Sequence, residues 1–67
     1  MDRRVAGVVR AELPSGLYRI ELDGAERVTA HAGTGSERNF IRLLVGDRVM
    51  VEVTARDVTR GRVVSKL

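Results

Sequence analysis

The sequence contains one segment with the look of a phosphate-binding loop, "HAGTGSER", which begins at His31. Its glycines, Gly33 and Gly35, match the first two of a dinucleotide fingerprint, but Arg38 stands where the third glycine is required. The Gly-Lys-Ser/Thr ending of a mononucleotide loop is absent as well. A chain of 67 residues also leaves little room for the surrounding β-α-β unit. The spacing therefore argues against a nucleotide cofactor.

The remaining reactive side chains do not form a recognisable catalytic set. His31 is the only histidine and cysteine is absent, so the usual ligand set of a catalytic zinc ion cannot be assembled. Ser36 or Ser65 beside His31 would satisfy only a weak test for a nucleophilic triad. The carboxylates occur singly among arginines, which does not favour acid-base catalysis. We expect no enzyme activity, no cofactor and no metal, with His31 as an exposed strand residue or an RNA contact.

The charged residues indicate a different class of ligand. The chain carries 12 Lys+Arg against 9 Asp+Glu, a net charge of +3, and all of the basic residues except Lys66 are arginines. Nucleic acid is the leading partner class, although a small excess of this kind also fits an ordinary basic surface. Arginine favours phosphate because its planar guanidinium offers two donors at once. The candidate cations are Arg38, Arg42, Arg48, Arg56, Arg60, Arg62 and Lys66.

Aromatic side chains are too scarce for RNA binding by extensive base stacking. Tyr18 alternates in phase with Ile20 and Leu22, so it is expected in the core. Phe40 could serve either as core or as a stacking platform. Recognition of phosphates and of folded RNA shape fits this composition better than the reading of a long single strand.

Composition also bounds the location and the size of the protein. The absence of cysteine fits a reducing compartment. The N-terminal "MDRRVAGVV" lacks the apolar run of a signal peptide, and no stretch reaches the roughly 20 apolar residues of a membrane span. We expect one cytoplasmic domain over residues 1–67 that does not contact membranes and is a monomer when free.

Hydrophobic periodicity predicts an all-β fold. Residues alternate between apolar and polar in several short segments, as in strands that bury one face. Pro14 marks one turn, and Asp23-Gly24 would permit the positive φ angles of a tight hairpin. The strands are expected at residues 5–13, 17–22, 26–32, 47–54 and 62–66, with the first three forming a meander. The side chains expected to face inward are Tyr18, Ile20, Leu22, Val28, Ala30, Val49, Val51 and Val53.

One segment departs from the strand period. Phe40, Ile41 and Leu44 recur at helical spacing, Thr34 and Glu37 could form a capping box, and the glycine at position 46 ends the segment. A short helix between the third and fourth of five strands describes an oligonucleotide-binding (OB) barrel.

The order of motifs resembles bacterial translation initiation factor one. The matching stretches are "LPSGLYRIELDG", "VTAH", "NFIRLLVGDRVMVEVT" and "RGRVV". The resemblance as a whole runs over residues 5–64 and needs no alignment gap. The most specific part is Asn39-Phe40-Ile41-Arg42, similar to the family's Asn-Tyr-Ile-Arg, followed by Gly46-Asp47-Arg48.

This resemblance implies an S1-like OB barrel that binds the aminoacyl-tRNA site of the small (30S) ribosomal subunit. It would contact the decoding region of 16S rRNA and a neighbouring ribosomal protein, and would assist initiator tRNA selection with initiation factors two and three. Four residues are carried over as RNA contacts from the matching motifs: His31, Phe40, Arg42 and Arg62. The full set of candidate rRNA-binding residues is His31, Arg38, Asn39, Phe40, Arg42, Arg60, Arg62 and Lys66.

The sequence departs from the family pattern at one expected contact surface. Thr34-Gly35-Ser36-Glu37 replaces a Gly-Lys-Met-Arg type loop, which leaves Arg38 as its positive charge. A divergent paralogue with a shifted target, or a generic RNA-binding or RNA-chaperone protein, is therefore an alternative. A third hypothesis is a protein-interaction module that uses an exposed sheet edge.

Overall fold

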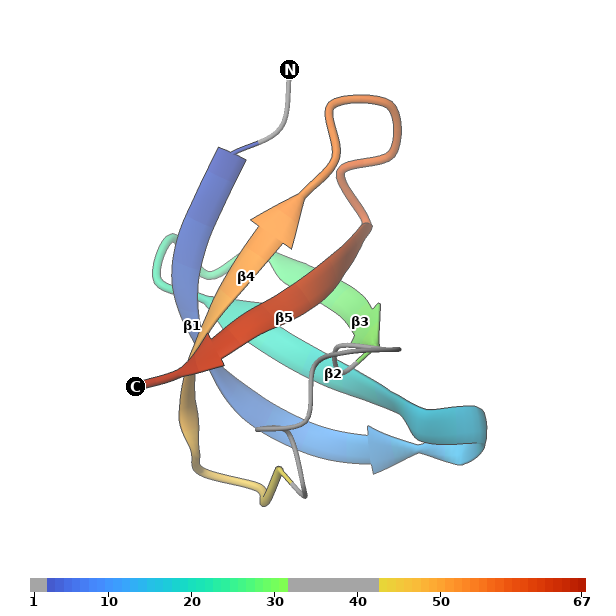
Figure 1. Cartoon of the computed structure of the whole chain (residues 1–67), viewed down its shortest axis with the longest axis vertical. Coiled ribbons are helices and arrows are strands. Elements are labelled where there is room, and N and C mark those ends of the chain that lie inside the picture. Colours follow the sequence, from blue (N-terminus) through green and yellow to red (C-terminus); the bar gives the residue numbers. More distant parts are fainter. Residues whose placement is uncertain (1–2, 32–42) are drawn as a thin grey trace.

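The computed structural model describes residues 3–31 and 43–67, and five strands make up most of that part of the chain (Figure 1). The elements are β1 (Arg3–Leu13), the 3-10 turn η1 (Pro14–Gly16), β2 (Leu17–Leu22), β3 (Arg27–His31), β4 (Arg48–Val53) and β5 (Arg60–Lys66). Among the described residues η1 is the only helical element. The predicted all-β class is confirmed.

The strands close into a barrel in the order β1-β2-β3-β5-β4, with β4 pairing back to β1. The first three strands form the predicted antiparallel meander. Closure depends on β5, which runs parallel to β3 and antiparallel to β4. Each of these five strands therefore has a neighbour on both sides, and the hypothesis of a partner added to an exposed sheet edge has no support in this topology.

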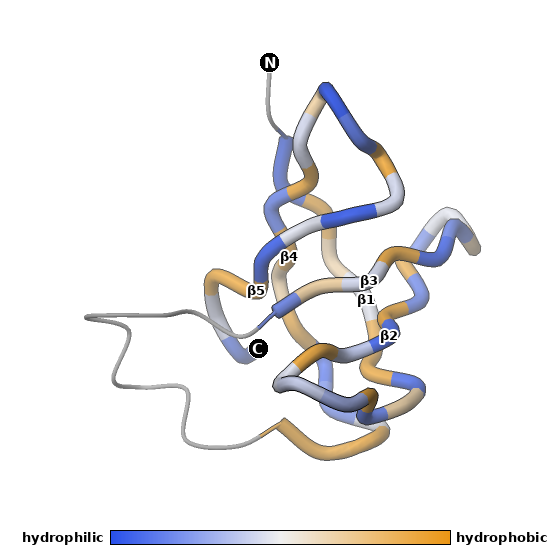
Figure 2. Tube along the Cα trace, turned by 90° about the vertical axis from the view of Figure 1, so that its right-hand side faces the viewer, coloured by the Kyte–Doolittle hydropathy of each residue, from blue (hydrophilic) through white to orange (hydrophobic). Residues whose placement is uncertain are grey.

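The period-two pattern correctly predicts which side chains enter the barrel. Figure 2 shows hydrophobic and hydrophilic residues alternating along the strands. Every side chain predicted to face inward is buried, including Tyr18, which is 8% exposed. No polar or charged side chain is buried among the described residues. The full core consists of Val9, Tyr18, Ile20, Leu22, Val28, Ala30, Leu43, Val49, Val51, Val53 and Val63.

The strand boundaries differ from the prediction where pairing is long-range. β1 begins at Arg3 because Arg3 pairs with Val53 of β4, and β5 begins at Arg60 because Arg60 pairs with Thr29 of β3. Alternation within a segment carries no information about these partners. The sequence pattern therefore predicts a polar connection around position 60, although β5 already begins there.

The β2–β3 turn also differs from the prediction. Gly24 has no positive φ; Ala25 instead occupies the left-handed region at φ 73°. Leu22 donates to the carbonyl of Glu26 at 2.7 Å, and Ala25 donates to that of Leu22 at 2.8 Å. These bonds make the connection longer than a two-residue hairpin turn, which moves the strained position beyond the glycine.

Most of the predicted short helix lies outside the described residues. At its C-terminal end Leu43 is buried in the core, whereas Leu44 is 56% exposed and lies in a non-helical segment. Asp47 forms a turn there, with its backbone N–H donating to Leu44 O at 3.0 Å and its carboxylate accepting from Leu44 N at 2.9 Å. Gly46, with φ 100°, lies inside this turn.

Candidate nucleic-acid interface

A row of side chains crosses the outer face of the barrel over four strands. Leu17 of β2 is paired with His31 of β3, His31 with Arg62 of β5, and Arg62 with Glu52 of β4. Residues directly opposite one another on neighbouring strands point to the same face. The four residues Leu17, His31, Arg62 and Glu52 are called the His31–Arg62 row below.

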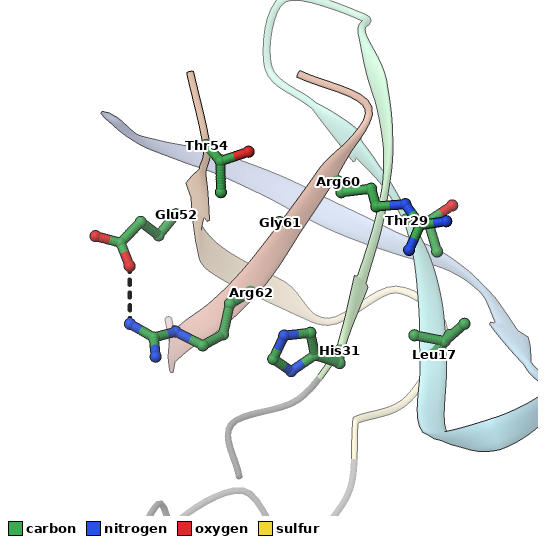
Figure 3. A pocket seen from close by; sticks show the side chains of 8 residues that line it. All are labelled: Leu17, Thr29, His31, Glu52, Thr54, Arg60, Gly61 and Arg62. Atoms are coloured by element: carbon green, nitrogen blue, oxygen red, sulfur yellow. Dashed lines mark hydrogen bonds and ion pairs between the residues drawn. The ribbon is translucent and has the colours of Figure 1, made fainter. Parts of the chain in front are cut away.

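Arg62 and Glu52 form an ion pair within this row. Arg62 donates from Nη2 to Glu52 Oε1 at 2.8 Å, drawn as a dashed line in Figure 3. The carboxylate side chain is 24% exposed and the guanidinium side chain 49% exposed. Figure 3 shows the imidazole of His31 between Arg62 and Leu17. The ion pair therefore fixes one side of the guanidinium while half of the side chain faces solvent.

A surface hollow of about 460 Å³ lies over this row. Thr29, Thr54, Arg60 and Gly61 complete its lining, together with the row itself. Two guanidinium groups and the hydroxyl of Thr29 give it hydrogen-bond donors suited to a phosphate or to a polar base edge, whereas the Thr54 hydroxyl already donates to Asp57 O at 3.1 Å. Glu52, the one carboxylate among the described residues that line it, is already engaged by Arg62. The hollow is chemically suited to binding an anion.

Gly61 allows β4 and β5 to approach each other beneath the hollow. A Cβ atom at this position would lie 2.8 Å from Glu52 O and 2.8 Å from Val51 Cγ1, closer than real Cβ contacts. Because glycine has no side chain, β4 and β5 can pack closely enough here to pair Glu52 with Arg62 in the observed register.

The connection between β4 and β5 positions Arg60 through Asp57. Thr59 donates to Asp57 Oδ1 from its backbone N at 3.0 Å and from its hydroxyl at 2.5 Å. The backbone N–H of Asp57 donates to Thr54 Oγ1 at 3.2 Å, and that of Arg60 donates to Asp57 O at 3.1 Å. The hydroxyl and backbone donors of Thr59, followed by the charge of Arg60, lower the pKa of the Asp57 carboxyl below 3.8. The loop thus holds an ionised carboxylate at its centre.

Lys66 lies apart from the hollow, near the start of β4. It is paired with Val49 in the sheet, and its Nζ is 3.3 Å from Asp47 Oδ2. The backbone N–H of Leu44, followed by Lys66, lowers the pKa of Asp47 below its ordinary value. Lys66 therefore contributes to the end of the barrel where the chain enters β4.

The structure brings together three of the eight residues proposed from the sequence. His31, Arg60 and Arg62 line one hollow, and Lys66 does not. Arg38, Asn39, Phe40 and Arg42 lie outside the described residues. Thr29 and Glu52 are site residues that the sequence motifs do not single out. Their outward phase was readable from the alternation, but their closeness to Arg60 and Arg62 depends on strand pairings that local patterns do not reveal.

Two further observations concern other classes of protein. Within residues 3–31 and 43–67, no group of three His, Cys, Asp or Glu side chains is arranged to hold a metal ion. No helix in the described part of the chain is long and apolar enough to cross a membrane.

Known proteins share both the fold and part of the sequence, although no family model matches the chain. The chain is similar to the solution structure of translation initiation factor one from the Wolbachia endosymbiont strain TRS of Brugia malayi, with a TM-score of 0.75 and 34% identity. This match covers 98% of the chain and 78% of the Wolbachia protein.

YjeQ from Thermotoga maritima shares the fold of this chain, with a TM-score of 0.71 and 24% identity over 97% of the chain and 23% of YjeQ. The resemblance to the Wolbachia factor extends further, since it combines the same barrel with a higher identity over nearly the whole chain. It supports a role in translation or RNA binding, and the chain belongs to the family of translation initiation factor one.

Proposed function

We propose that this protein is a translation initiation factor that occupies the aminoacyl-tRNA site of the small ribosomal subunit. In this role it contacts decoding-region rRNA and a neighbouring ribosomal protein in the cytoplasm, and assists initiator tRNA selection with initiation factors two and three. Membership of the initiation factor one family supports the proposal. The structural observation that carries it is the convergence of His31, Arg60 and Arg62 on one surface hollow.

The chemistry proposed for this site is binding without catalysis. Arg60 and Arg62 offer charged donors to phosphate oxygens, and His31 offers a ring that can hydrogen-bond or stack on a base. Arg38, Asn39, Phe40 and Arg42 are proposed to extend the same contact by their match to the family motif. A barrel whose core is already packed loses little conformational entropy on docking, which suits a factor that acts by occupying space.

Chemical footprinting of small-subunit RNA tests the proposed function directly. The RNA is probed with and without the protein, and protection is expected at the decoding region. Protection elsewhere, with the decoding region unchanged, would contradict the proposal.

A matched pair of variants tests the assigned contact. Arg62→Ala is expected to flatten the dependence of subunit binding on salt concentration by about one unit on a double-logarithmic plot. Arg3→Ala, which removes an exposed arginine of β1 whose ion-pair partner is Glu26, should leave that slope unchanged. Equal slopes for wild type and Arg62→Ala would remove Arg62 from the interface.

Generic RNA binding or RNA-chaperone activity is the second candidate. It is favoured by the neutral Thr34-Gly35-Ser36 and the acidic Glu37 at an expected contact surface. Comparable affinities for unstructured RNA and for small subunits would support this candidate, whereas a clear preference for subunits would support the initiation role.

A further inference from the structure

Arg19 and Arg27 lie on the outer face of two neighbouring strands, β2 and β3. Arg19 is paired with Thr29, and Arg27 with Glu21, so the two arginines occupy diagonal positions on one face. Diagonal neighbours across a strand pair lie within reach of long side chains. Both residues are exposed.

The local arrangement leaves these two arginines without an ionic partner among the described residues. Arg27 lies opposite Glu21, but the Glu21 carboxylate accepts from Arg10 Nε at 2.8 Å across the β1–β2 pair. The neighbours of Arg19 across its two strand pairs are Ala11 and Thr29, neither of which carries a charge. The carboxylate opposite Arg27 is therefore engaged by Arg10 through Oε1, and no ion pair to Arg19 or Arg27 forms among the described residues.

Four arginines of the described residues, Arg4, Arg19, Arg27 and Arg56, form no ion pair there, and Arg19 and Arg27 are the two of these that lie diagonally on paired strands. The basic residues that form ion pairs within the described part of the chain are Arg3, Arg10, Arg48, Arg60, Arg62 and Lys66. Two like charges on adjacent strands repel each other, and an anion placed between them would relieve that repulsion.

Arg19 and Arg27 line two adjoining hollows of about 280 Å³ each. One hollow also includes Thr29 and Arg60, which line the hollow over the His31–Arg62 row as well. Arg60 approaches Asp57 only at 3.7 Å, between two exposed side chains, so this pairing would compete weakly with an incoming phosphate. Side chains that can donate hydrogen bonds therefore extend from the His31–Arg62 row across β3 to β2.

We propose that Arg19, Arg27, Thr29 and Arg60 form a second phosphate-binding surface, named here the Arg19–Arg27 surface. It binds the sugar-phosphate backbone of an RNA segment next to the one held by the His31–Arg62 row. The planar guanidinium groups contact phosphate oxygens through paired donors, and Thr29 is paired with Arg19 on one side and with Arg60 on the other. The inference rests on the proposed function in taking RNA as the partner, and it adds Arg19 and Arg27 to the contacts assigned there.

The test measures how binding depends on salt for the double variant Arg19→Gln/Arg27→Gln. Small subunits and a short RNA oligonucleotide of mixed sequence are both titrated. Each lost phosphate contact is expected to reduce the slope of log K against log salt by about 0.7–0.9. Affinity at low salt should fall about tenfold per contact, in line with a charged hydrogen bond.

Two further variants keep the result interpretable. Arg19→Lys/Arg27→Lys preserves the charge and should restore most of the salt slope, since lysine still releases counterions on binding phosphate. Arg3→Gln makes a single-charge change on β1 and should keep the wild-type slope. Wild-type slopes in the double glutamine variant, or an equal per-charge change in Arg3→Gln, would overturn the proposal.

The experiment separates this inference from the proposed function. Loss of salt slope with decoding-region protection retained would support both. Loss of slope on the oligonucleotide, with no decoding-region protection by the wild-type protein, would support the Arg19–Arg27 surface and contradict the initiation role. An unchanged salt slope in Arg19→Gln/Arg27→Gln, with the decoding region still protected by the wild-type protein, would overturn the Arg19–Arg27 surface and leave the initiation role standing.

Discussion

Arg62 of β5 donates to Glu52 of β4 at 2.8 Å, and this contact places a carboxylate directly beside the cation assigned to RNA. In the free protein Glu52 neutralises part of the charge that a phosphate would use. The Arg62 side chain remains 49% exposed, so an incoming phosphate can reach it without the barrel opening. The ion pair therefore orients Arg62 and at the same time competes with its ligand.

Glu52→Gln is expected to strengthen RNA binding at low salt. The substitution keeps the shape of the side chain and an acceptor oxygen for Arg62 but removes the competing negative charge. Affinity should rise several-fold, and the gain should shrink as salt screens the surface. Titration of a short RNA oligonucleotide over a range of salt concentrations measures this effect.

The same variant should have little effect on folding, because exposed ion pairs contribute only about 0–1 kcal/mol. Urea unfolding provides that control. Glu26→Gln, which removes the partner of Arg3, matches the charge change at a different position and should leave RNA affinity closer to wild type. Weaker RNA binding by Glu52→Gln would mean that orientation of Arg62 outweighs competition.

Gly61→Ala is expected to destabilise the barrel. The added Cβ would meet Glu52 O and Val51 Cγ1 at 2.8 Å each, and overpacking of this kind costs about 1–3 kcal/mol. Gly24→Ala is the matched control, because its Cβ would meet only Glu26 Oε1 at 3.8 Å and its φ is not positive. Urea unfolding of both variants should show a lower free energy of unfolding for Gly61→Ala and an unchanged one for Gly24→Ala.

Much of the fold could be predicted from local patterns. Strict alternation in residues 17–22 and 48–53 identifies both the strands and their buried faces, because one face of each strand must contact the core. The turn at Pro14 was predictable for a similar reason, since the φ angle of proline is fixed by its ring.

The candidate site could be predicted only in part, because it depends on which strands become neighbours. The sequence placed His31 and Arg62 among the RNA contacts through family motifs, but the carboxylate beside Arg62 follows from the β4–β5 register. Arg27 has no ion-pair partner among the described residues because Glu21, which lies opposite it, binds Arg10 instead. Competition between two cations for one anion is decided by three-dimensional distances, which sequence spacing does not contain.

Ala25→Gly is expected to stabilise the β2–β3 turn. Ala25 has a φ of 73°, a region in which its Cβ is crowded and glycine is not. Relief of this strain should raise the free energy of unfolding by about 1 kcal/mol. Ala11→Gly in β1 is the control, and it should lose about 0.5–1 kcal/mol because glycine is unfavourable inside a strand. Urea unfolding of the two variants should give changes of opposite sign.

Asp57 is expected to make the stability of the protein depend on pH in the acid range. The hydroxyl and backbone donors of Thr59 lower the pKa of its carboxyl below 3.8 in the folded state. The unfolded chain therefore binds more protons than the folded chain around that pH. The resulting stabilisation is complete above the unfolded pKa, and it is lost as the pH falls through the lower, folded pKa. Asp47 contributes with the same sign.

Asp57→Asn isolates this contribution, because the amide keeps an acceptor oxygen for Thr59 but cannot ionise. At neutral pH the variant should unfold at a lower urea concentration than wild type, and this difference should disappear below the folded pKa, where wild-type Asp57 is itself neutral. Asp23→Asn, at the exposed partner of Arg48, controls for the loss of one negative charge. A difference between Asp57→Asn and wild type that stays constant through the acid range would show that Asp57 acts through its shape and not through its charge.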